Sequence, residues 1–277
     1  MSDLAPHEVV LSLFPGAGLL DRGFTAAGFC VVRGPDTLWG HDVRTWRCAK
    51  YQFWGIIGGP PCQDFSSARR AAPTGEGLEL LGEWRRIILE AAPIWYLMEN
   101  VHRVPTVEIP GYHVQRFNLK ASECGAAQSR LRTFQFGQLK VPGLSTRPLV
   151  IPRCSEPQEL SPAAMASEGS RKGRRGWPEF CRLQGLPPDF DLVGMTRAGK
   201  YRCVGNGVPV QMATVLAQAV KEWRHRGAEL KRVCVCECGR EVPAGKTLAT
   251  PACRKRMQRR RDSAAVHEVG PVTPELL

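Results

Sequence analysis

The sequence lacks any long hydrophobic run. Its first apolar stretch covers only Val9 to Phe14, and no segment approaches the roughly 20 consecutive apolar residues that a membrane-spanning helix needs. Met1 to His7 also lacks the basic start of a secretory signal peptide. We therefore expect a cytosolic protein without a membrane partner.

The cysteine content does not suit a disulfide framework. The chain of 277 residues has 11 cysteines, an odd number, and no secretory segment accompanies them. Reactive or metal-binding thiols are the better expectation. The composition, 43% hydrophobic and 23% charged, is that of an ordinary globular protein and fits one main domain plus a small appendage.

Positive charge is concentrated near the end of the chain. The net charge is +12, and Lys221 to Arg261 alone carries 13 Lys or Arg against 4 Asp or Glu. Such a block favours a polyanionic partner, because each cation placed at a phosphate releases condensed counterions. A solvated tail is the competing interpretation, and charge alone does not separate the two.

Alternating strand and helix patterns predict a mixed α/β sheet. Expected strands cover residues 9–14, 29–32, 53–57, 94–98, 112–119 and 131–136, the last two antiparallel, and expected helices cover 19–27, 78–92 and 208–223. The predicted organisation is a catalytic and cofactor-binding part (1–132), a short recognition segment (133–176), a return to the catalytic domain (177–226) and a basic tail (227–277).

A glycine turn follows the first expected strand. Phe14-Pro15-Gly16-Ala17-Gly18 stands where α/β folds bind nucleotides. It lacks the third glycine of the dinucleotide fingerprint and the Gly-Lys-Ser/Thr of a P-loop, which disfavours NAD and ATP. Asp36 and Asp42 fall near the ends of the next strands. Each could bind a ribose or an adenine amine, or could be a solvated acid in a loop.

Cys62 follows the third strand on a turn rich in glycine and proline, Gly58 to Gln63. That position presents a thiol at the carboxyl edge of the sheet, where a nucleophile is useful. The next residues, Asp64 to Gly77, predict a mobile loop that closes over nucleic acid. Its candidate contacts, with Gln63 before it, are Ser66, Arg69 and Arg70.

Glu99 ends the fourth strand and should lie at the same edge as Cys62. A carboxyl group there can donate to a ring nitrogen or accept from an amine. Gln128, Arg130 and Arg132 are spaced by two, which places them on one face of a strand. Surface strands carry such residues routinely, so this last pattern is weak by itself.

Together these elements resemble the cytosine-5 DNA methyltransferases. Six segments match motifs of that family in the family's order: Phe14-x-Gly16-x-Gly18, Pro60-Pro61-Cys62-Gln63, Glu99-Asn100-Val101, Gln128-x-Arg130-x-Arg132, Glu179 to Gly185 with Pro187 and Phe190, and Gly205-Asn206-Gly207-Val208-Pro209. The resemblance covers residues 9–220. It implies a Rossmann-like, S-adenosylmethionine-dependent methyltransferase fold with helices on both faces of the sheet.

The resemblance also implies the chemistry. Cys62 would add to C6 of a cytosine flipped out of double-stranded DNA, Glu99 would bind the amidine edge, and Arg130 and Arg132 would bind O2 and the adjoining backbone. S-adenosylmethionine would be the methyl donor. Its expected contacts are Phe14, Gly16, Ala17, Gly18, Asp36, Asp42, Val43, Pro61, Asn206 and Val208.

Two segments depart from the family pattern. Asp36 and Asp42 are too close in sequence for the helix that normally joins the second and third strands, so Asp36 is only a stand-in for the usual acidic ribose ligand. The recognition segment is also short, which predicts low specificity or readout shared with the basic tail. The segment also contains a cluster of four cations, Arg171, Lys172, Arg174 and Arg175. They are either phosphate contacts or solvated charges of a linker.

The tail holds four cysteines within 20 residues, Cys234, Cys236, Cys238 and Cys253, followed by two Arg/Lys triplets. They predict either a structural zinc site or a thiol-bearing basic arm that binds DNA nonspecifically, since Cys-x-Cys-x-Cys is not the usual paired spacing. We expect a monomer, and the sequence does not indicate whether a restriction endonuclease accompanies it. Two rival functions remain: methylation of transfer RNA, and a catalytically silent DNA-binding relative.

Overall fold

A computed structural model describes residues 9–66, 72–140, 146–170, 173–225, 232–233, 241–242, 250–256 and 258–259. The chain divides into two compact units, Met1–His225 and Arg226–Leu277. The first unit contains all of the candidate catalytic and cofactor-binding residues. In the second unit, two short strands, β9 (Arg232–Val233) and β10 (Glu241–Val242), pair antiparallel.

The first unit is built on one mixed sheet of six strands. They are β1 (Val9–Leu13), β2 (Cys30–Arg33), β3 (Gly55–Gly58), β4 (Trp95–Asn100), β5 (Tyr112–Lys120) and β7 (Leu131–Leu139), in the spatial order β2-β1-β3-β4-β7-β5. The first four are parallel, whereas β7 is antiparallel to both β4 and β5. The carboxyl ends of β1, β3 and β4 therefore meet at one edge, as the sequence predicts.

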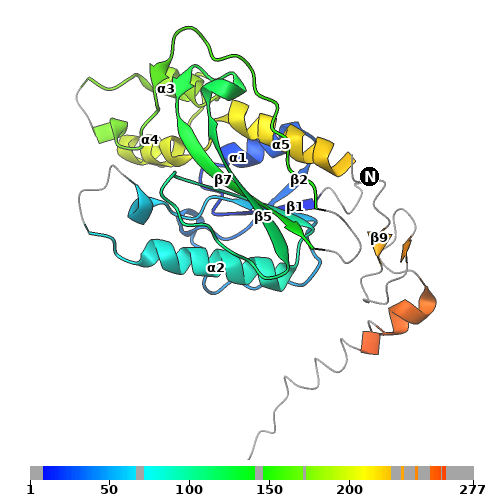
Figure 1. Ribbon diagram of the computed structural model, residues 1–277. Coiled ribbons are helices and arrows are strands. Elements are labelled where there is room, and N and C mark those ends of the chain that lie inside the picture. Colours follow the sequence, from blue (N-terminus) through cyan, green and yellow to red (C-terminus); the bar gives the residue numbers. More distant parts are fainter. Residues whose placement is uncertain are drawn as a thin grey trace, which may run out of the picture. The chain divides into compact units, whose positions relative to one another are not determined.

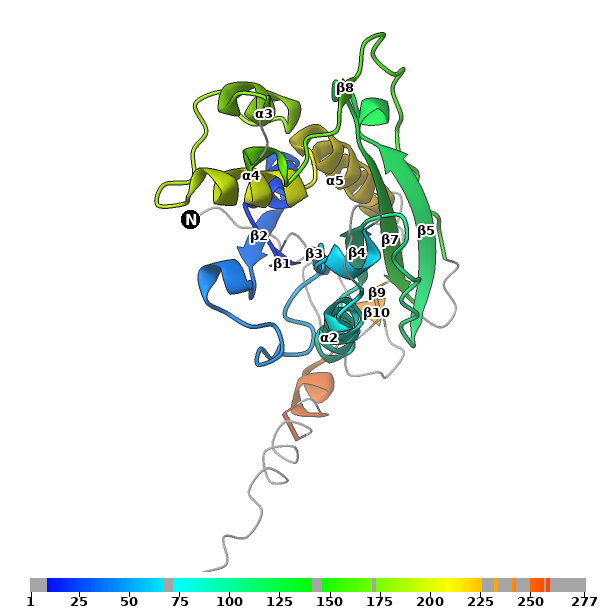
Figure 2. The ribbon, with the colours of Figure 1, turned by 90° about the vertical axis from the view of Figure 1, so that its left-hand side faces the viewer.

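Helices cover both faces of this sheet (Figures 1 and 2). On one face lie α1 (Leu19–Ala26) and α5 (Val210–His225), and on the other lies α2 (Glu76–Ala91). Phe24 of α1 and Met212 of α5 pack against Trp95 in one buried cluster, while Trp84 of α2 packs against Tyr96 in a second. Adjacent residues of β4 thus point to opposite faces, so β4 is buried on both sides.

A smaller layer of helices follows the recognition segment. It consists of α3 (Trp177–Leu183) and α4 (Arg197–Asn206), with β8 (Ser161–Pro162) paired to β6 (Gln128–Ser129). Short 3-10 turns complete the unit: η2 (Thr37–Trp39), η3 (Gln63–Phe65), η4 (Ser122–Cys124) and η5 (Glu168–Ser170). Ala17 and Leu19 share a buried cluster with Phe180 and Tyr201, so this layer packs against the glycine turn.

The connection from β2 to β3 contains no α-helix in the described chain, only η2. The close spacing of Asp36 and Asp42 predicts this absence, and the structure confirms it. None of the described helices has the length and apolarity required to cross a bilayer.

Candidate active site

The turn that carries Cys62 is fixed to the end of β4. Asn100 donates from Nδ2 to the carbonyl oxygen of Pro60 at 3.0 Å, and its Oδ1 accepts the N–H of Val101 at 2.9 Å. Asn100 is buried, so these hydrogen bonds lie in a low-dielectric environment, where they are stronger than in water. Cys62, the residue directly before η3, is partly buried and is a free thiol.

Glu99 lies directly beside this turn. A Cβ atom built on Gly59 would come within 2.8 Å of Glu99 Oε2, so the turn lies in direct contact with the carboxyl group. On its other side, Glu99 Oε1 is 2.8 Å from Nε of Arg132. The predicted meeting of Cys62, Glu99 and Arg132 at one edge of the sheet is therefore what the structure contains.

Burial controls the charge of both acidic groups. Burial raises the pKa of the Cys62 thiol, and the charge of Glu99 raises it further, while Arg132 and Arg130 act in the opposite direction. Burial likewise raises the pKa of Glu99, against the opposing effect of the two arginines. The centre thus holds a thiol and a carboxyl group whose pKa values burial raises, beside two arginines that oppose the effect.

Arg130 points away from solvent. Its Nη1 donates to the carbonyl of Ala164 at 2.9 Å, and its Nη2 contacts the carbonyls of Gly205, Asn206 and Gly207 at 2.8 to 3.3 Å. Burial lowers the pKa of its guanidinium to about 9. Of the Arg130 side-chain nitrogens, Nε has no partner among the described residues. The bonds made by Nη1 and Nη2 join the two halves of the catalytic domain.

Gln128 is also turned inward. The side chain is fully buried, and its amide nitrogen donates to the carbonyl of Leu183 and to Oε1 of Gln184. Its Oε1 accepts the N–H of Ala164 at 3.1 Å. A direct contact of Gln128 with nucleic acid is not supported by this geometry, because every polar atom of the side chain is used within the protein.

The glycine turn has an unusual backbone with open space above it. Phe14, Gly16 and Gly18 have φ values of 54°, 52° and 73°. Asp36 Oδ2 accepts the N–H of Gly16 at 2.8 Å, and Trp39 donates to the carbonyl of Gly16 at 3.2 Å. A Cβ on Gly16 would meet no atom within 4 Å. A ligand can therefore approach this backbone, with the Asp36 carboxylate beside it.

Three side chains brace this turn from behind. Asp21 is buried and accepts from Ser12 Oγ at 2.6 Å and from Arg33 Nε at 2.9 Å. The Arg33 guanidinium lies against Gly18, where a Cβ would be 2.0 Å from Nη2. The turn is thus tied to both β1 and β2. Neither Ser12 nor Asp21 is expected as a functional residue from the sequence, although Asp21 in the first turn of a helix is a recognisable signal.

Asp42 and Val43 stand on a loop that α2 holds in place. Asp42 pairs with Arg44 at 3.0 Å, and the backbone N–H of Arg44 lowers the pKa of the Asp42 carboxyl group. Arg86 of α2 donates to the carbonyl of Val43 at 3.0 Å. Val43 itself is buried in the cluster beneath α2.

The C-terminal motif returns to the N-terminal sheet. A Cβ on Gly207 would be 3.0 Å from the side chain of Leu19 at the start of α1. Asn206 is exposed beside it, and Val208 is buried. Pro61 is partly buried next to Cys62. Of these residues, Gly207 is the one that the structure places against the start of α1, directly after the glycine turn.

The predicted loop after Cys62 is anchored at both ends by one acid. The carboxylate of Asp64 accepts the N–H and hydroxyl of Thr74 and the N–H of Gly77 at 2.9 to 3.2 Å. Gln63 is exposed and Ser66 partly buried. No role is predicted for Asp64 from the sequence. Its position two residues after Cys62 is the only feature of the sequence that could have indicated its anchoring role.

The remaining predicted residues are only partly described. Arg69, Arg70, Arg171, Lys172, Cys234, Cys236 and Cys238 lie outside the described residues. Arg175 forms an ion pair with buried Glu168 and donates to the carbonyls of Pro162 and Ala163, so it stabilises the recognition segment rather than facing outward. Arg174 lines a cavity described below. Cys253 is buried within the second unit, 3.2 Å from Thr250 Oγ1.

Comparison with known proteins gives a consistent result. The family model described as C-5 cytosine-specific DNA methylase matches residues 37–174 and 176–222. The Type II methyltransferase M.HgiDI of Herpetosiphon aurantiacus is 26% identical, across 77% of this chain and 94% of its own length. M.MthTI of Methanothermobacter thermautotrophicus is 30% identical, across 77% of this chain and 97% of its own length.

A solved structure shares the fold. The Entamoeba histolytica methyltransferase EhMeth superposes with a TM-score of 0.58 at 12% identity, over 78% of this chain and 98% of that one. This likeness concerns the fold alone. Cys62, Glu99, Arg130, Arg132 and Asn206 all fall within the residues that the family model matches, whereas the glycine turn precedes them.

Proposed function

The chain belongs to the C-5 cytosine-specific DNA methylase family, and from this membership we propose that it methylates C5 of cytosine in DNA with Cys62 as its nucleophile. The observation that carries the proposal is the meeting of Cys62, Glu99 and Arg132 at the carboxyl edge of β3 and β4. A thiol, a carboxyl group of raised pKa and a guanidinium are the groups that activation of a pyrimidine ring requires.

Nucleophilic addition begins the reaction. The Cys62 thiol loses its proton to solvent, and the thiolate forms a bond to C6 of the flipped base. The electrons of the C5=C6 bond move towards C5 and the N3–O2 side of the ring. Glu99, carrying a proton, donates it to N3, and Arg132 stabilises charge that develops at O2. C5 then accepts the methyl group that S-adenosylmethionine would supply, and C5 loses its proton to solvent. Cleavage of the S–C6 bond releases Cys62, and the N3 proton returns to Glu99.

The raised pKa values make the two acids dependent on each other. Ionised Glu99 raises the pKa of Cys62, so a thiolate forms most easily when Glu99 is protonated. Both pKa values respond to the same arginine charges. We infer that a cytosine whose N3 shares a proton with Glu99 reduces this repulsion, which lowers the pKa of Cys62 and favours the thiolate when the pocket is filled.

Membership of a methyltransferase family implies S-adenosylmethionine as the cofactor, and the residues present fit it. When bound, it supplies the methyl group as a sulfonium substituent. Gly16 gives the open backbone, and Phe14 offers an aromatic face. The Asp36 carboxylate accepts the N–H groups of Gly16 and Leu38, and each of its oxygens has a further lone pair for a ribose hydroxyl. We propose Asp42, Val43, Pro61, Asn206 and Val208 as further contacts.

Other features stay predictions. They are a cytosolic location, a monomeric state and zinc bound by the tail cysteines. A zinc site predicts about one equivalent of zinc per chain after extensive dialysis, and less than about half an equivalent would count against it.

Expression in a methylation-free bacterial host, followed by bisulfite sequencing of the host DNA, tests the proposed function. The wild-type chain should protect cytosines within one sequence context, and Cys62→Ser should protect none. Purified protein should also transfer labelled methyl groups to duplex DNA and not to transfer RNA. Protection of no cytosine, with labelling of transfer RNA alone, would overturn the DNA assignment.

A further inference from the structure

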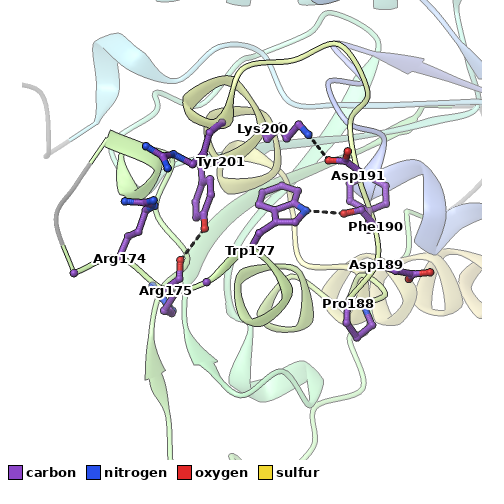
Figure 3. Close-up of a pocket in the computed structure, with 12 residues that line it drawn as sticks. Arg174, Arg175, Trp177, Pro188, Asp189, Phe190, Asp191, Lys200 and Tyr201 are labelled. Carbon is purple, nitrogen blue, oxygen red and sulfur yellow. Dashed lines mark hydrogen bonds and ion pairs between the residues drawn. The ribbon is translucent and has the colours of Figure 1, made fainter.

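A cavity of about 750 Å³ lies outside the catalytic centre, in the helical layer (Figure 3). Its walls come from residues 173–177, from 188–191 and from the first turns of α4. Residues 173–176 are the end of the short recognition segment, and the other wall residues follow it. The volume lies in the range of about 300 to 1,000 Å³ that is usual for small-ligand pockets.

The walls are joined by hydrogen bonds. The Tyr201 hydroxyl donates to the carbonyl of Arg175 at 2.7 Å, and Trp177 Nε1 donates to the carbonyl of Phe190 at 2.6 Å. Figure 3 shows both bonds bridging different wall segments. The cavity is therefore a built feature of the fold rather than a gap between unconnected loops.

Three aromatic rings line the cavity: Trp177, Phe190 and Tyr201. Trp177 is partly buried, and its ring stacks on Phe180 with centroids 5.9 Å apart and an interplanar angle of 18°. Phe180 is fully buried, and Tyr201 also packs against the indole, with ring centroids 5.1 Å apart and an interplanar angle of 58°. An indole fixed in this way is a stacking platform for a nucleobase, whatever the base.

The charges of the cavity favour an anion. It is lined by four cations, Arg174, Arg175, Arg197 and Lys200, against two acids, Asp189 and Asp191. Lys200 pairs with Asp191, and Arg175 pairs with Glu168 outside the cavity. Arg197, exposed at the start of α4, contributes a further positive charge at the mouth.

We propose that this cavity binds one nucleotide of the DNA substrate other than the flipped cytosine, with its phosphate at Arg197 and its base against Trp177. The inference rests on the proposed function, and it adds a second DNA contact besides that with the flipped cytosine. DNA is favoured over other anions because aromatic stacking surfaces and phosphate-binding cations occur in the same cavity. Ala17 of the glycine turn packs in the same cluster as Tyr201, so the cavity adjoins the cofactor region.

A pair of charge reversals on one helix tests the phosphate contact. Arg197→Glu changes the cavity mouth, whereas Arg202→Glu makes the same change at an exposed position of α4 that does not line the cavity. Affinity for a duplex is measured as a function of salt concentration. Arg197→Glu should bind at least about fivefold more weakly than Arg202→Glu, and its salt dependence should fall by about one phosphate contact.

Abasic scanning tests the base contact. Wild-type protein should lose affinity when one flanking nucleotide lacks its base, and Trp177→Leu should be insensitive to that loss; Trp177→Phe, which keeps a ring, should retain the sensitivity. Equal salt dependence in Arg197→Glu and Arg202→Glu, or indifference of the wild type to every abasic position, would overturn the inference. Competition by polyglutamate as strong as that by DNA, lost in Arg197→Glu, would also overturn it in favour of an acidic protein partner.

The proposed function is judged by a separate readout. Wild-type protein is incubated with DNA containing 5-fluorocytosine and S-adenosylmethionine, and the covalent protein–DNA adduct is counted. If the wild type forms the adduct but Arg197→Glu and Arg202→Glu bind DNA with the same affinity and salt dependence, only the proposed nucleotide binding in the cavity is rejected. Failure of the wild type to form any adduct rejects the proposed function itself.

Discussion

Arg132 on β7 holds Glu99 on β4 through an ion pair of 2.8 Å between Nε and Oε1. The two strands are antiparallel neighbours, and Gly59 on the far side of the carboxyl group leads into the turn of Cys62. Glu99 raises the pKa of Cys62, and Arg132 lowers it. Burial has the largest effect on the pKa of Cys62, and residues on two other segments of the sheet edge adjust it further.

Replacement of Glu99 by Gln should make Cys62 more reactive towards an alkylating reagent. The change removes the negative charge that raises the pKa of the thiol, so at any pH below that pKa a larger fraction of Cys62 is thiolate. Each unit by which the pKa falls increases that fraction about tenfold. The measurement is the iodoacetamide rate at the Cys62 peptide as a function of pH.

Exposed Cys154 is the internal control for this experiment, because it lies on a different segment and should react at the same rate in both proteins. Methyl transfer by Glu99→Gln should fall by roughly 10² to 10⁴, the usual contribution of a general acid. Slower alkylation of Cys62 in Glu99→Gln than in the wild type would contradict the electrostatic account.

Replacement of Arg130 by Met should destabilise the protein strongly. Four carbonyl oxygens, on Ala164 and Gly205 to Gly207, would lose a charged donor in a buried place. We expect the free energy of unfolding to fall by at least about 3 kcal/mol. Denaturant titration of the full chain measures it.

Arg85→Met is the matched control for that measurement. Arg85 is exposed and makes a bond of 3.2 Å to the carbonyl of Glu108, so its loss should cost less than about 1 kcal/mol. Similar midpoints for Arg130→Met and Arg85→Met would show that Arg130 does not join the two halves of the domain.

Replacement of Asp21 by Asn should weaken cofactor binding with little effect on the chemical step. Asn keeps the shape of Asp21 but removes the charge that holds Arg33 and reorients the bond to Ser12, which loosens the glycine turn. We expect the Kd for S-adenosylmethionine to rise roughly tenfold, or about 1.4 kcal/mol, with kcat nearly unchanged at saturation.

Calorimetric titration with S-adenosylmethionine measures this effect, and Glu156→Gln serves as the control. Glu156 pairs with Lys120 at the surface, and such pairs contribute little. An unchanged Kd in Asp21→Asn, or a loss confined to kcat, would show that the brace behind the turn does not position the cofactor.

The sequence predicts the parts of the site that depend on strand order. Cys62 and Glu99 each follow a parallel strand, and neighbouring parallel strands end at one edge, so their meeting follows from connectivity. The alternation of Gln128, Arg130 and Arg132 is likewise visible in the structure, where Ser129 and Leu131 are exposed and the other three are buried or partly buried.

The direction in which those side chains point is not contained in the local pattern. Arg130 and Gln128 bond to carbonyls of Gly205 and Leu183, residues more than 50 positions away. Only the return of the C-terminal segment brings those acceptors close, so a strand pattern alone cannot distinguish a base contact from a structural bond. Arg175 is a similar case, because its partner Glu168 is buried only in the folded segment.

Covalent trapping tests the central claim most directly. DNA containing 5-fluorocytosine at the target site, incubated with S-adenosylmethionine, should give a stable adduct with the wild-type protein, because fluorine cannot leave C5 as the proton does. Peptide mapping should place the bond at Cys62, and Cys62→Ser should give no adduct. Absence of an adduct with the wild type, or a bond at any other residue, would contradict the account.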